Sequence, residues 1–400
     1  MWQQSLTNQS DCDKGGPGVL QTANVRRAYS TSRSPVTAAR EMLSGLFQPD
    51  LQLVVVFCTA AFDLDRLGRE IAVCFGETPV IGCTTAGEIT PIGYMEGVIS
   101  GFSMAGSGFT VVTDLIPDIS NLQIPRGFAV VDRLIAAFAE RGRAIDPRDT
   151  FAMLLIDGMC STEEAVLTSL HRRLDPIVLF GGSAGDDMRL EKTFVLHGGR
   201  FHCDAAVLTL VQTSHRFRVF RRQHFSPTNT RMVVTGADPI RRVVTEIDAE
   251  PAGPEYARIV GLDYHVLGPI VFAEFPVMVR VGGDYYVRSI QKANADRSLT
   301  FFSAIDEGLV LTLARRSDMV EDLRSFFHDI RAEMGQPMLV IAFDCVLRSL
   351  EAESRQIRNL ASKILAENNV IGFSTYGEQL AAMHVNHTFT GVFISEEQGK

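Results

Sequence analysis

The stretches VIGCTTAGE, at residues 80–88, and VIGFSTYGE, at residues 370–378, share six identities at a constant offset of 290. A related turn, GGSAGD at residues 181–186, lies between them. Each joins an apolar run to a glycine-rich turn that ends in a carboxylate. Strand–helix–strand units with such turns are the building blocks of parallel-sheet α/β proteins. The repetition therefore predicts an α/β fold with duplicated strand–helix–strand units.

The residues around each turn predict the other parts of these units. Continuous apolar runs, typical of strands buried on both faces, precede the turns at 51–60, 151–159 and 338–346. Helices are predicted from the N-cap pair Ser34-Pro35, near 63–75, from the capping box Ser161-Thr-Glu-Glu164, and near 351–366. Each unit is expected to end in an alternating run: VISGFSM (98–104), TFVLHG (193–198) and TFTGVFI (388–394).

The organisation outside these units suggests two lobes. Residues 1–24 are polar and glycine-rich and are expected to form a disordered tail. Residues 207–312 contain short alternating apolar runs, which predict a strand-rich central section, mostly antiparallel. A boundary near residues 235–250 would divide the chain into domains at 25–237 and 238–395.

Composition excludes several classes of protein. The 400 residues contain 38 Lys and Arg against 47 Asp and Glu, a net charge of −9, and 46% are hydrophobic. This balance excludes a disordered chain and argues against nucleic-acid binding, which needs a positive surface. No apolar run reaches the length of a membrane span, and no signal peptide is evident. Seven cysteines without CxxC spacing fit free thiols, so we expect a cytoplasmic location.

The order of these motifs resembles the FIST sensory domain. GCTTAGE, a strand carrying Asp-Gly, GGSAGD, a strand-rich centre and a closing GFSTYGE follow one another over roughly residues 25–395. The resemblance implies paired FIST N and FIST C domains in a sensory protein.

Three longer stretches are similar to one branch of that family, the NosP-type nitric-oxide-sensing proteins. They are residues 241–263, 277–314 and 372–394. This resemblance implies a non-enzymatic sensor that holds haem b, binds nitric oxide and alters the autophosphorylation of a partner histidine kinase, in two-component control of biofilm formation or cyclic-di-GMP metabolism. One position departs from the family pattern: His387 stands where a Gln is expected, in His384-Val-Asn-His387.

A haem sensor needs an axial ligand, and histidine is the default because no Cys-Pro or CxxCH sequence is present. His384 is the first candidate for the iron ligand, since it follows a glycine-rich turn at the expected carboxyl edge of a sheet. His387 would point to the opposite face of an extended segment. His202, in a hairpin-like segment with His197, and His224, beside Arg221 and Arg222, are further candidates, with a solvated loop as the alternative for each.

The three turns offer a second type of site. Their hydroxyls and backbone N–H groups could cradle an anion, and the residues concerned are Thr84, Thr85, Gly87, Glu88, Ser183, Gly185, Asp186, Ser374, Thr375, Tyr376, Gly377 and Glu378. The carboxylate after each turn instead favours an amine or the turn's own backbone. The alternative function is therefore a FIST module that binds a small metabolite such as an amino acid, without haem.

The sequence also offers two other candidate features. Cys83 or Cys345 could act as a nucleophile in an enzyme, although no GxSxG or HExxH motif accompanies them. A basic stretch is expected to form a solvated strand face, with propionate pairing or kinase docking as the alternative; its members are Arg216, Arg218, Arg221, Arg222, Arg241 and Arg242. The sequence sets no oligomeric state and is compatible with a homo-oligomer.

Overall fold

The computed structural model describes residues 20–22 and 24–399. Residues 1–19 and 23 of the expected tail lie outside this range. Leu20–Thr22 form strand β1, which pairs antiparallel with β2 (Val25–Ser30). Among the described residues, no helix is long and apolar enough to cross a bilayer.

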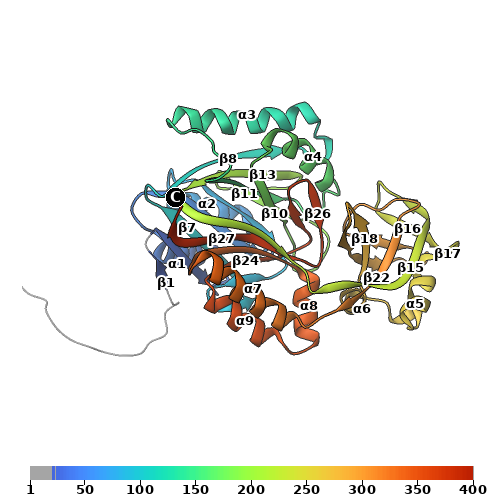
Figure 1. The fold of residues 1–400 in the computed structure, drawn as a ribbon. Helices are drawn as coiled ribbons and strands as arrows, with labels where there is room; N and C mark the ends of the chain where they lie inside the picture. The colour runs from blue at the N-terminus through green and yellow to red at the C-terminus, as the bar shows by residue number, and fades with distance from the viewer. Residues whose placement is uncertain (1–19, 23, 400) are drawn as a thin grey trace, which may run out of the picture.

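The main body of the molecule contains three copies of one strand order, where the sequence predicted duplication (Figure 1). Each copy has an outer strand, a parallel pair and a returning strand. The outer strands are β2, β8 (Phe109–Pro117) and β14 (His215–Arg222). The parallel pairs are β3 (Leu51–Thr59) with β4 (Val80–Thr85), β9 (Thr150–Ile156) with β10 (Val178–Ser183), and β23 (Pro337–Cys345) with β24 (Val370–Thr375). The returning strands are β7 (Ile99–Ala105), β13 (Ala205–Thr213) and β27 (Phe389–Gln398).

Each copy completes the sheet of another copy with a short hairpin. The hairpins are β5–β6 (Glu88–Thr90, Gly93–Met95), β11–β12 (Val195–His197, Arg200–His202) and β25–β26 (Glu378–Leu380, Met383–Val385). They pair with β24, β4 and β10, respectively. The first copy therefore extends the third sheet, the third extends the second, and the second extends the first. This closed exchange gives the body a pseudo-threefold arrangement.

The exchange corrects one sequence expectation. The run TFVLHG was expected to end the second unit, but it supplies β11 of the exchanged hairpin. The returning strand of that unit is β13, which pairs with β8 and β9. Periodicity identified both segments as strands and carried no information about their partners.

Helices cover the outer face of each sheet, and a central core fills the space between the sheets. The helices are α1 (Pro35–Leu46), α2 (Leu64–Phe75), α3 (Ile124–Glu140), α4 (Glu163–Leu174), α7 (Met319–Met334), α8 (Val346–Ser354) and α9 (Arg358–Glu367). Phe57, Phe180 and Phe343, one from each copy, meet in the central core at ring-centroid distances of 6.2 Å (Phe57–Phe343) and 5.5 Å (Phe180–Phe343). The single helix expected near 351–366 is two helices, because the chain turns at Gln356 with φ +57°.

The glycine shared by the first and third turns is required by packing. A Cβ on Gly82 would lie 1.9 Å from the carbonyl oxygen of Val56, and one on Gly372 would lie 1.7 Å from that of Ala342. Both contacts are with backbone of the parallel neighbour. The recurrent glycine therefore allows the parallel strands of each pair to approach closely.

A separate lobe is inserted into the third copy, between β14 and α7 (Figure 1). It contains β15 (Phe225–Asp238), β16 (Val243–Ile247), β17 (Glu250–Pro251), β18 (Val277–Val281), β19 (Asp284–Arg288), β20 (Ile290–Ala293), β21 (Leu299–Phe301), β22 (Val310–Arg316), α5 (Ala252–Val260) and α6 (Pro269–Glu274). Its strands pair antiparallel, as expected, around a core of their own. Strand β15 continues through Gly236, and the chain returns to the body after Arg316.

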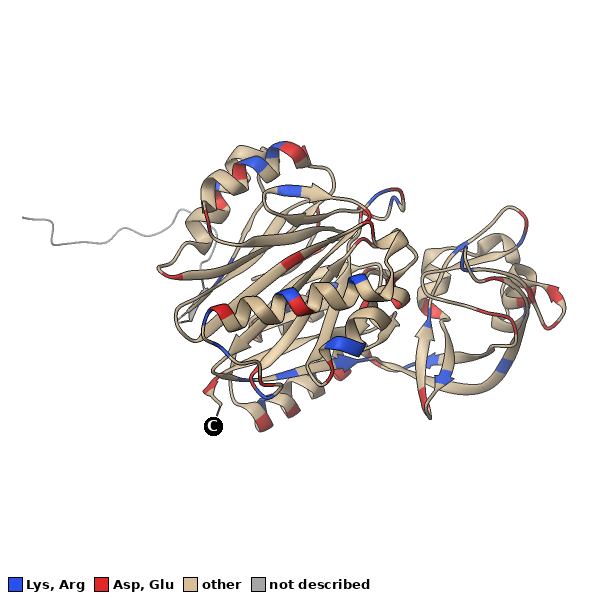
Figure 2. Cartoon of the chain, turned by 90° about the horizontal axis from the view of Figure 1, so that it is seen from above, with Lys and Arg blue, Asp and Glu red and all other residues tan. Residues whose placement is uncertain are grey.

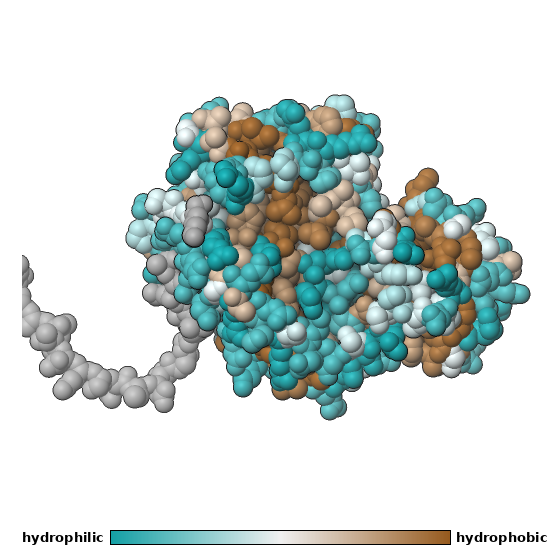
Figure 3. All heavy atoms as spheres, viewed as in Figure 1, coloured by the Kyte–Doolittle hydropathy of each residue, from teal (hydrophilic) through white to brown (hydrophobic). Residues whose placement is uncertain are grey.

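The surface of the body shows a mixture of charges. Figure 2 shows acidic and basic residues interspersed along the outer helices. Hydrophobic residues reach the surface between the layer of α3 and that of β27 (Figure 3). The partly buried side chains that pack on the central core are Leu115, Val178, Phe217 and Val219.

Candidate functional site

The three turns meet at the carboxyl ends of the parallel pairs and hydrogen-bond to one another. The N–H of Gly185 donates to the carbonyl of Thr84 (2.9 Å) and that of Ser183 to Gly377 (2.8 Å). The N–H of Ala86 donates to Ser374 (3.0 Å). These donors of the turns are therefore used between the turns, and they are not free to cradle an anion.

The carboxyl groups after the turns are buried and bonded to the protein. Thr85 donates its hydroxyl to Glu88 at 2.6 Å, and Thr375 and Thr388 donate theirs to Glu378. Burial raises the pKa of both Glu88 and Glu378 to about 8. Near neutral pH these groups are mainly protonated, so they lack the charge that would attract the ammonium group of an amino acid.

Asp186 differs from the other two and is bonded to backbone. It accepts N–H groups from Leu190 (2.8 Å), Glu191 (2.7 Å) and Lys192 (2.9 Å), as well as the hydroxyl of Tyr376. A carboxylate that folds the following loop in this way has little capacity left for a ligand. The residues of the three turns thus hold the junction of the three sheets together.

The lobe covers this junction. Phe302 and Ala273 of the lobe pack with Tyr376, Cys345 and Val346 of the body in one apolar cluster, and the Phe302 and Tyr376 rings are 5.9 Å apart. We call the contact zone between the lobe and the three turns, including β25–β26 and the start of α4, the seam. In open α/β sheets this carboxyl edge is where ligands bind.

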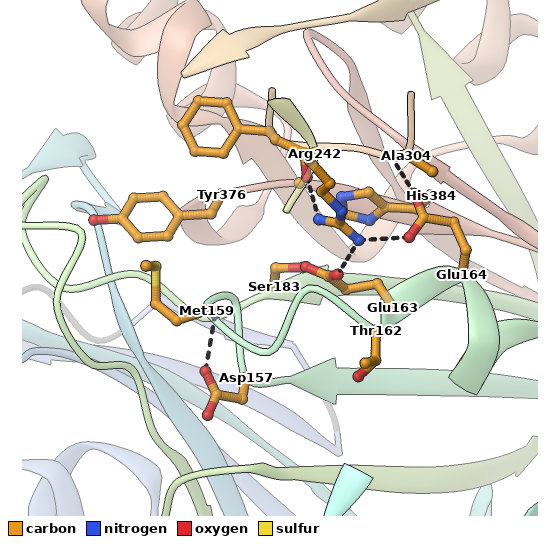
Figure 4. Close-up of polar contacts among 12 residues, drawn as sticks. Asp157, Met159, Thr162, Glu163, Glu164, Ser183, Arg242, Ala304, Tyr376 and His384 are labelled. Atoms are coloured by element: carbon orange, nitrogen blue, oxygen red, sulfur yellow. Dashed lines mark hydrogen bonds and ion pairs between the residues drawn. The ribbon is translucent and has the colours of Figure 1, made fainter. Parts of the chain in front are cut away.

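Arg242 of the lobe joins it to the body across the seam (Figure 4). Its Nη2 lies 2.6 Å from carboxylate oxygens of both Glu163 and Glu164, at the start of α4. Its Nη1 donates to the carbonyl of Phe302 at 2.5 Å. Arg242 is only 5% exposed and has a φ of +54°. A buried, doubly paired arginine was not expected in the basic stretch.

The ion pairs also replace the expected capping box at α4. Ser161 has a φ of +55°, and the N-cap residue Thr162 makes no side-chain cap bond. The Glu164 carboxylate accepts the N–H of Ala304 at 2.8 Å instead of turning back to its own helix. Contacts with the lobe outcompete the local capping pattern.

His384, the first candidate ligand, lies in the seam on β26 and is 1% exposed (Figure 4). Its Nδ1 is 3.1 Å from the amide nitrogen of Gln379, and its Nε2 has no hydrogen-bond partner. Arg288 of the lobe donates to its carbonyl at 2.9 Å. Burial lowers its pKa, against the opposing charges of Glu163 and Glu164. His384 is therefore a neutral imidazole with one unpartnered nitrogen.

His387 occupies a different environment. Its ring stacks on Phe225 with a centroid distance of 4.9 Å and an interplanar angle of 11°, and neither ring nitrogen has a partner. Burial is the largest cause that lowers its pKa, to about 3. Its φ of +55° ends the extended segment. The two histidines thus face different neighbours, His384 in the seam and His387 where the lobe joins the body.

His224 is buried where the lobe joins the body and does not lie at a solvated loop tip. Its Nε2 donates to Glu351 at 2.8 Å, and Arg348 donates to its Nδ1 at 2.6 Å. Arg348 also donates to Asp344 at 2.5 Å. The N–H of Ser317 bonds to the carbonyl of His224 at 2.7 Å, which ties together the two chain segments that enter and leave the lobe. With both nitrogens engaged, His224 has no lone pair for a metal.

Of the remaining candidates, His202 lies on the hairpin β11–β12, whereas Cys345 belongs to the apolar cluster at the seam. His202 is on β12, where its Nε2 is 3.3 Å from the carbonyl of His197. Burial raises the pKa of the Cys83 and Cys345 thiols well above the usual value, which makes them poor nucleophiles. In the part of the chain that the structure describes, no group of three or more His, Cys, Asp or Glu is placed to hold a metal ion.

A polar cavity of about 760 Å³ opens at the other end of the body, near the amino end of β9. Arginines of the basic stretch line it, and they are paired on the surface: Arg216 with Glu397 and Arg218 with Glu333. Because its charges are largely paired, we favour the seam as the functional site despite the size of this cavity.

The seam contains several buried polar atoms that lack hydrogen-bond partners. Besides His384 Nε2, they are Gln379 Oε1, Arg288 Nε, Ser289 Oγ and Ser303 Oγ. An unsatisfied buried polar group costs about 1–3 kcal/mol, so native proteins rarely keep such groups without a function or a bound partner. Sequence reasoning missed Gln379, Arg288, Glu163 and the role of Arg242. Only Gln379 gave a signal, because it directly follows the third turn.

Comparisons with known protein families match two domains of the same family, one after the other along the chain. The FIST N domain matches residues 52–250, and the FIST C domain matches residues 252–381. An uncharacterized protein of Methanocaldococcus jannaschii, MJ1623, is 23% identical over 393 residues, covering 86% of this chain and 74% of that protein. The FIST N match ends and the FIST C match begins within the lobe, so both domains contribute to the seam.

Proposed function

The chain is a FIST-domain protein, and from this premise we propose that it is a sensor whose signal-binding group is held in the seam between body and lobe. The observation that carries the proposal is the buried His384. Its Nε2 has no hydrogen-bond partner, and other buried polar atoms of the seam also lack partners. A site between two bodies suits a sensor, because a ligand there changes the relative stability of their arrangements.

We propose haem b as that group and nitric oxide as the signal. The residues present that fit haem are a neutral imidazole with an unpartnered nitrogen, an apolar cluster around Phe302 and Tyr376, and Arg288, whose Nε has no partner. When bound, the haem iron would supply the binding site for nitric oxide. The side chain of His384 would hold the iron, and Gln379 would orient the imidazole.

Access to His384 requires a change at the seam. His384 is 1% exposed, and Arg242 bridges Glu163 and Glu164 beside it. Loading a planar group against His384 therefore requires the lobe to move on its two connecting segments. Haem bound there would hold the lobe in a different position. We propose that a partner histidine kinase in two-component signalling distinguishes these positions.

Absorption spectra of protein expressed with haem supply test the proposal in the ferric, ferrous and nitric-oxide-treated states. We expect about one equivalent of haem and a Soret band that shifts with nitric oxide. His384→Ala should lose the haem. His202→Ala, on the distant β12, and His387→Gln, which restores the family residue, are the controls and should keep it. A wild-type protein that refuses added haemin, or a His384→Ala variant that keeps it, overturns the proposal.

A second candidate is a small metabolite without haem. The hydroxyls of Ser289 and Ser303 beside the Phe302 cluster would suit a ligand with one polar and one apolar side. The carboxyls after the turns give it no support, because Glu88 and Glu378 are mainly protonated and Asp186 is bonded to backbone N–H groups. Calorimetric titration with a panel of amino acids tests it: heat that is lost in Ser303→Ala would support it, and no heat above dilution would remove it.

A further inference from the structure

Gln379 connects His384 to two of the three turns through one buried amide. Its amide nitrogen lies 3.1 Å from Nδ1 of His384, 2.8 Å from Oγ of Ser183 and 3.3 Å from the carbonyl of Gly377. Its amide oxygen has no hydrogen-bond partner. The side chain is fully buried on β25. The amide therefore has three neighbours on its nitrogen and none on its oxygen.

This orientation fixes the proton on His384. An amide nitrogen only donates, so Nδ1 of His384 must be the acceptor. A neutral imidazole carries one proton, and that proton is then on Nε2. The unpartnered nitrogen in the seam is consequently an N–H donor with no lone pair to offer. The free protein would therefore present a donor where an iron ligand needs an acceptor.

A 180° rotation of the Gln379 amide would exchange the positions of its nitrogen and oxygen and so reverse the tautomer of His384. Its oxygen would then accept a proton from Nδ1 of His384, as the second nitrogen of a metal-bound histidine normally requires. Nε2 would present a lone pair to the seam. The Ser183 hydroxyl can rotate and donate to the same oxygen, whereas the carbonyl of Gly377 would lose its 3.3 Å contact.

We infer that Gln379 is a two-position amide that sets the tautomer of His384 and so decides whether the seam presents a hydrogen-bond donor or a ligand for iron. Gln379 acts as a positioning residue, since only His384 would touch the iron. The iron-binding half of this inference rests on the proposed function. The tautomer of the free protein does not.

The same amide links the ligand site to the junction of the sheets. Ser183 donates its N–H to the carbonyl of Gly377 at 2.8 Å and accepts the N–H of Tyr376 at 3.3 Å. Tyr376 in turn packs against Phe302 of the lobe. Reversing the Gln379 amide changes the hydrogen bonds of Ser183 and Gly377. The tautomer of His384 is therefore coupled to the turn that contacts the lobe. Gln379 is thus a two-state element next to both sites.

Nitrogen NMR of ¹⁵N-histidine-labelled protein without haem tests the tautomer directly, with the His384 signals assigned by their loss in His384→Ala. We expect the Nε2–H form in the wild type and, above the pH at which the introduced carboxyl ionises and can only accept, a shift toward the Nδ1–H form in Gln379→Glu. A wild-type His384 in the Nδ1–H form overturns the inference, as does an unchanged tautomer in a folded Gln379→Glu. The wild-type measurement decides even if the variant fails to fold.

Haemin titration then separates this inference from the proposed function. Gln379→Met removes the second partner of the imidazole and is expected to weaken haemin binding about 10- to 100-fold, with His202→Ala as the unaffected control. If the wild type binds haemin through His384 and Gln379→Met binds equally well, the positioning role is wrong and the proposed function stands. If the wild type binds no haemin, the proposed function fails, and the NMR result still decides the tautomer.

Discussion

The junction of the three turns and the adjacent seam differ in how their buried polar groups are hydrogen-bonded. In the junction, Glu88, Asp186 and Glu378 are bonded to hydroxyls or backbone of the body. In the seam, His384, Gln379 and Ser303 keep atoms without partners. The most recognisable motifs therefore maintain the fold, whereas the proposed site depends on less recognisable residues on the hairpin and the lobe.

The largest effect should come from filling the close approach in the junction. Gly372→Ala would place a Cβ 1.7 Å from the Ala342 carbonyl, a backbone atom that cannot move aside. We expect a loss of more than about 3 kcal/mol in the free energy of unfolding, or no folded protein. Urea denaturation measures it. Gly268→Ala, with open space around the new Cβ, is the control and should cost less than about 1 kcal/mol. Equal stability of the two variants would show that the junction is not tightly packed.

The next effect tests the attachment of the lobe at the seam. Arg242→Ala leaves the buried Glu163 and its neighbour Glu164 without their cation. Because an uncompensated buried charge is costly, we expect a loss of about 3 kcal/mol. We also expect faster amide hydrogen exchange in β26. Arg241→Ala, at the exposed neighbouring position, is the control and should change stability by less than about 0.5 kcal/mol. A wild-type exchange rate in Arg242→Ala would contradict the role of the pair in closing the seam.

The raised pKa of about 8 for Glu88 and Glu378 predicts how stability depends on pH. Between pH 6.5 and 8 these carboxyls are ionised in the unfolded chain and still protonated in the folded protein. The folded state therefore binds more protons, and stability falls as pH rises, by at most roughly 1.4 kcal/mol per pH unit for each group and by less as the pH approaches 8. Their stabilising contribution is greatest below the unfolded pKa near 4.5.

Urea denaturation at pH 6.5 and pH 8 checks this slope. Glu378→Gln removes one titrating group and should make the loss of stability smaller, while Glu367→Gln on the exposed side of α9 should leave it unchanged. The neutral buried histidines oppose this trend only at lower pH, since their pKa values lie below 6.5. A Glu378→Gln protein with the full wild-type slope would mean that Glu378 is ionised in the junction.

The smallest effect is expected at an ion pair remote from both regions. Arg218 pairs with Glu333 on the surface, and both side chains are about half exposed. Surface pairs contribute little, so Arg218→Ala should change the free energy of unfolding by less than about 0.5 kcal/mol. If Arg218→Ala lowers the free energy of unfolding as much as Arg242→Ala does, the ion pairs of the seam are no stronger than those of the surface.

Sequence patterns predicted the local elements well. The β-branched runs at 51–60 and 338–346 are buried strands, and Ser34 caps its helix by accepting the N–H of Thr37. Local chemistry also failed in a defined way at Ser161–Glu164, where a capping box was expected. There the carboxylates bond to Arg242 and Ala304, residues distant in sequence.

Local sequence was enough to identify the glycine-rich turns, the buried strands and His384 as a residue of interest, because turn chemistry and hydrophobic periodicity act over a few neighbouring residues. Which sheet each hairpin joins, and that Arg242 meets Glu163, follow from the tertiary structure alone. Strand pairing and ion pairing depend on the relative position of distant segments, and a short strand carries no signal that names its partner. The orientation of Gln379 toward His384 is likewise a consequence of the exchanged hairpin.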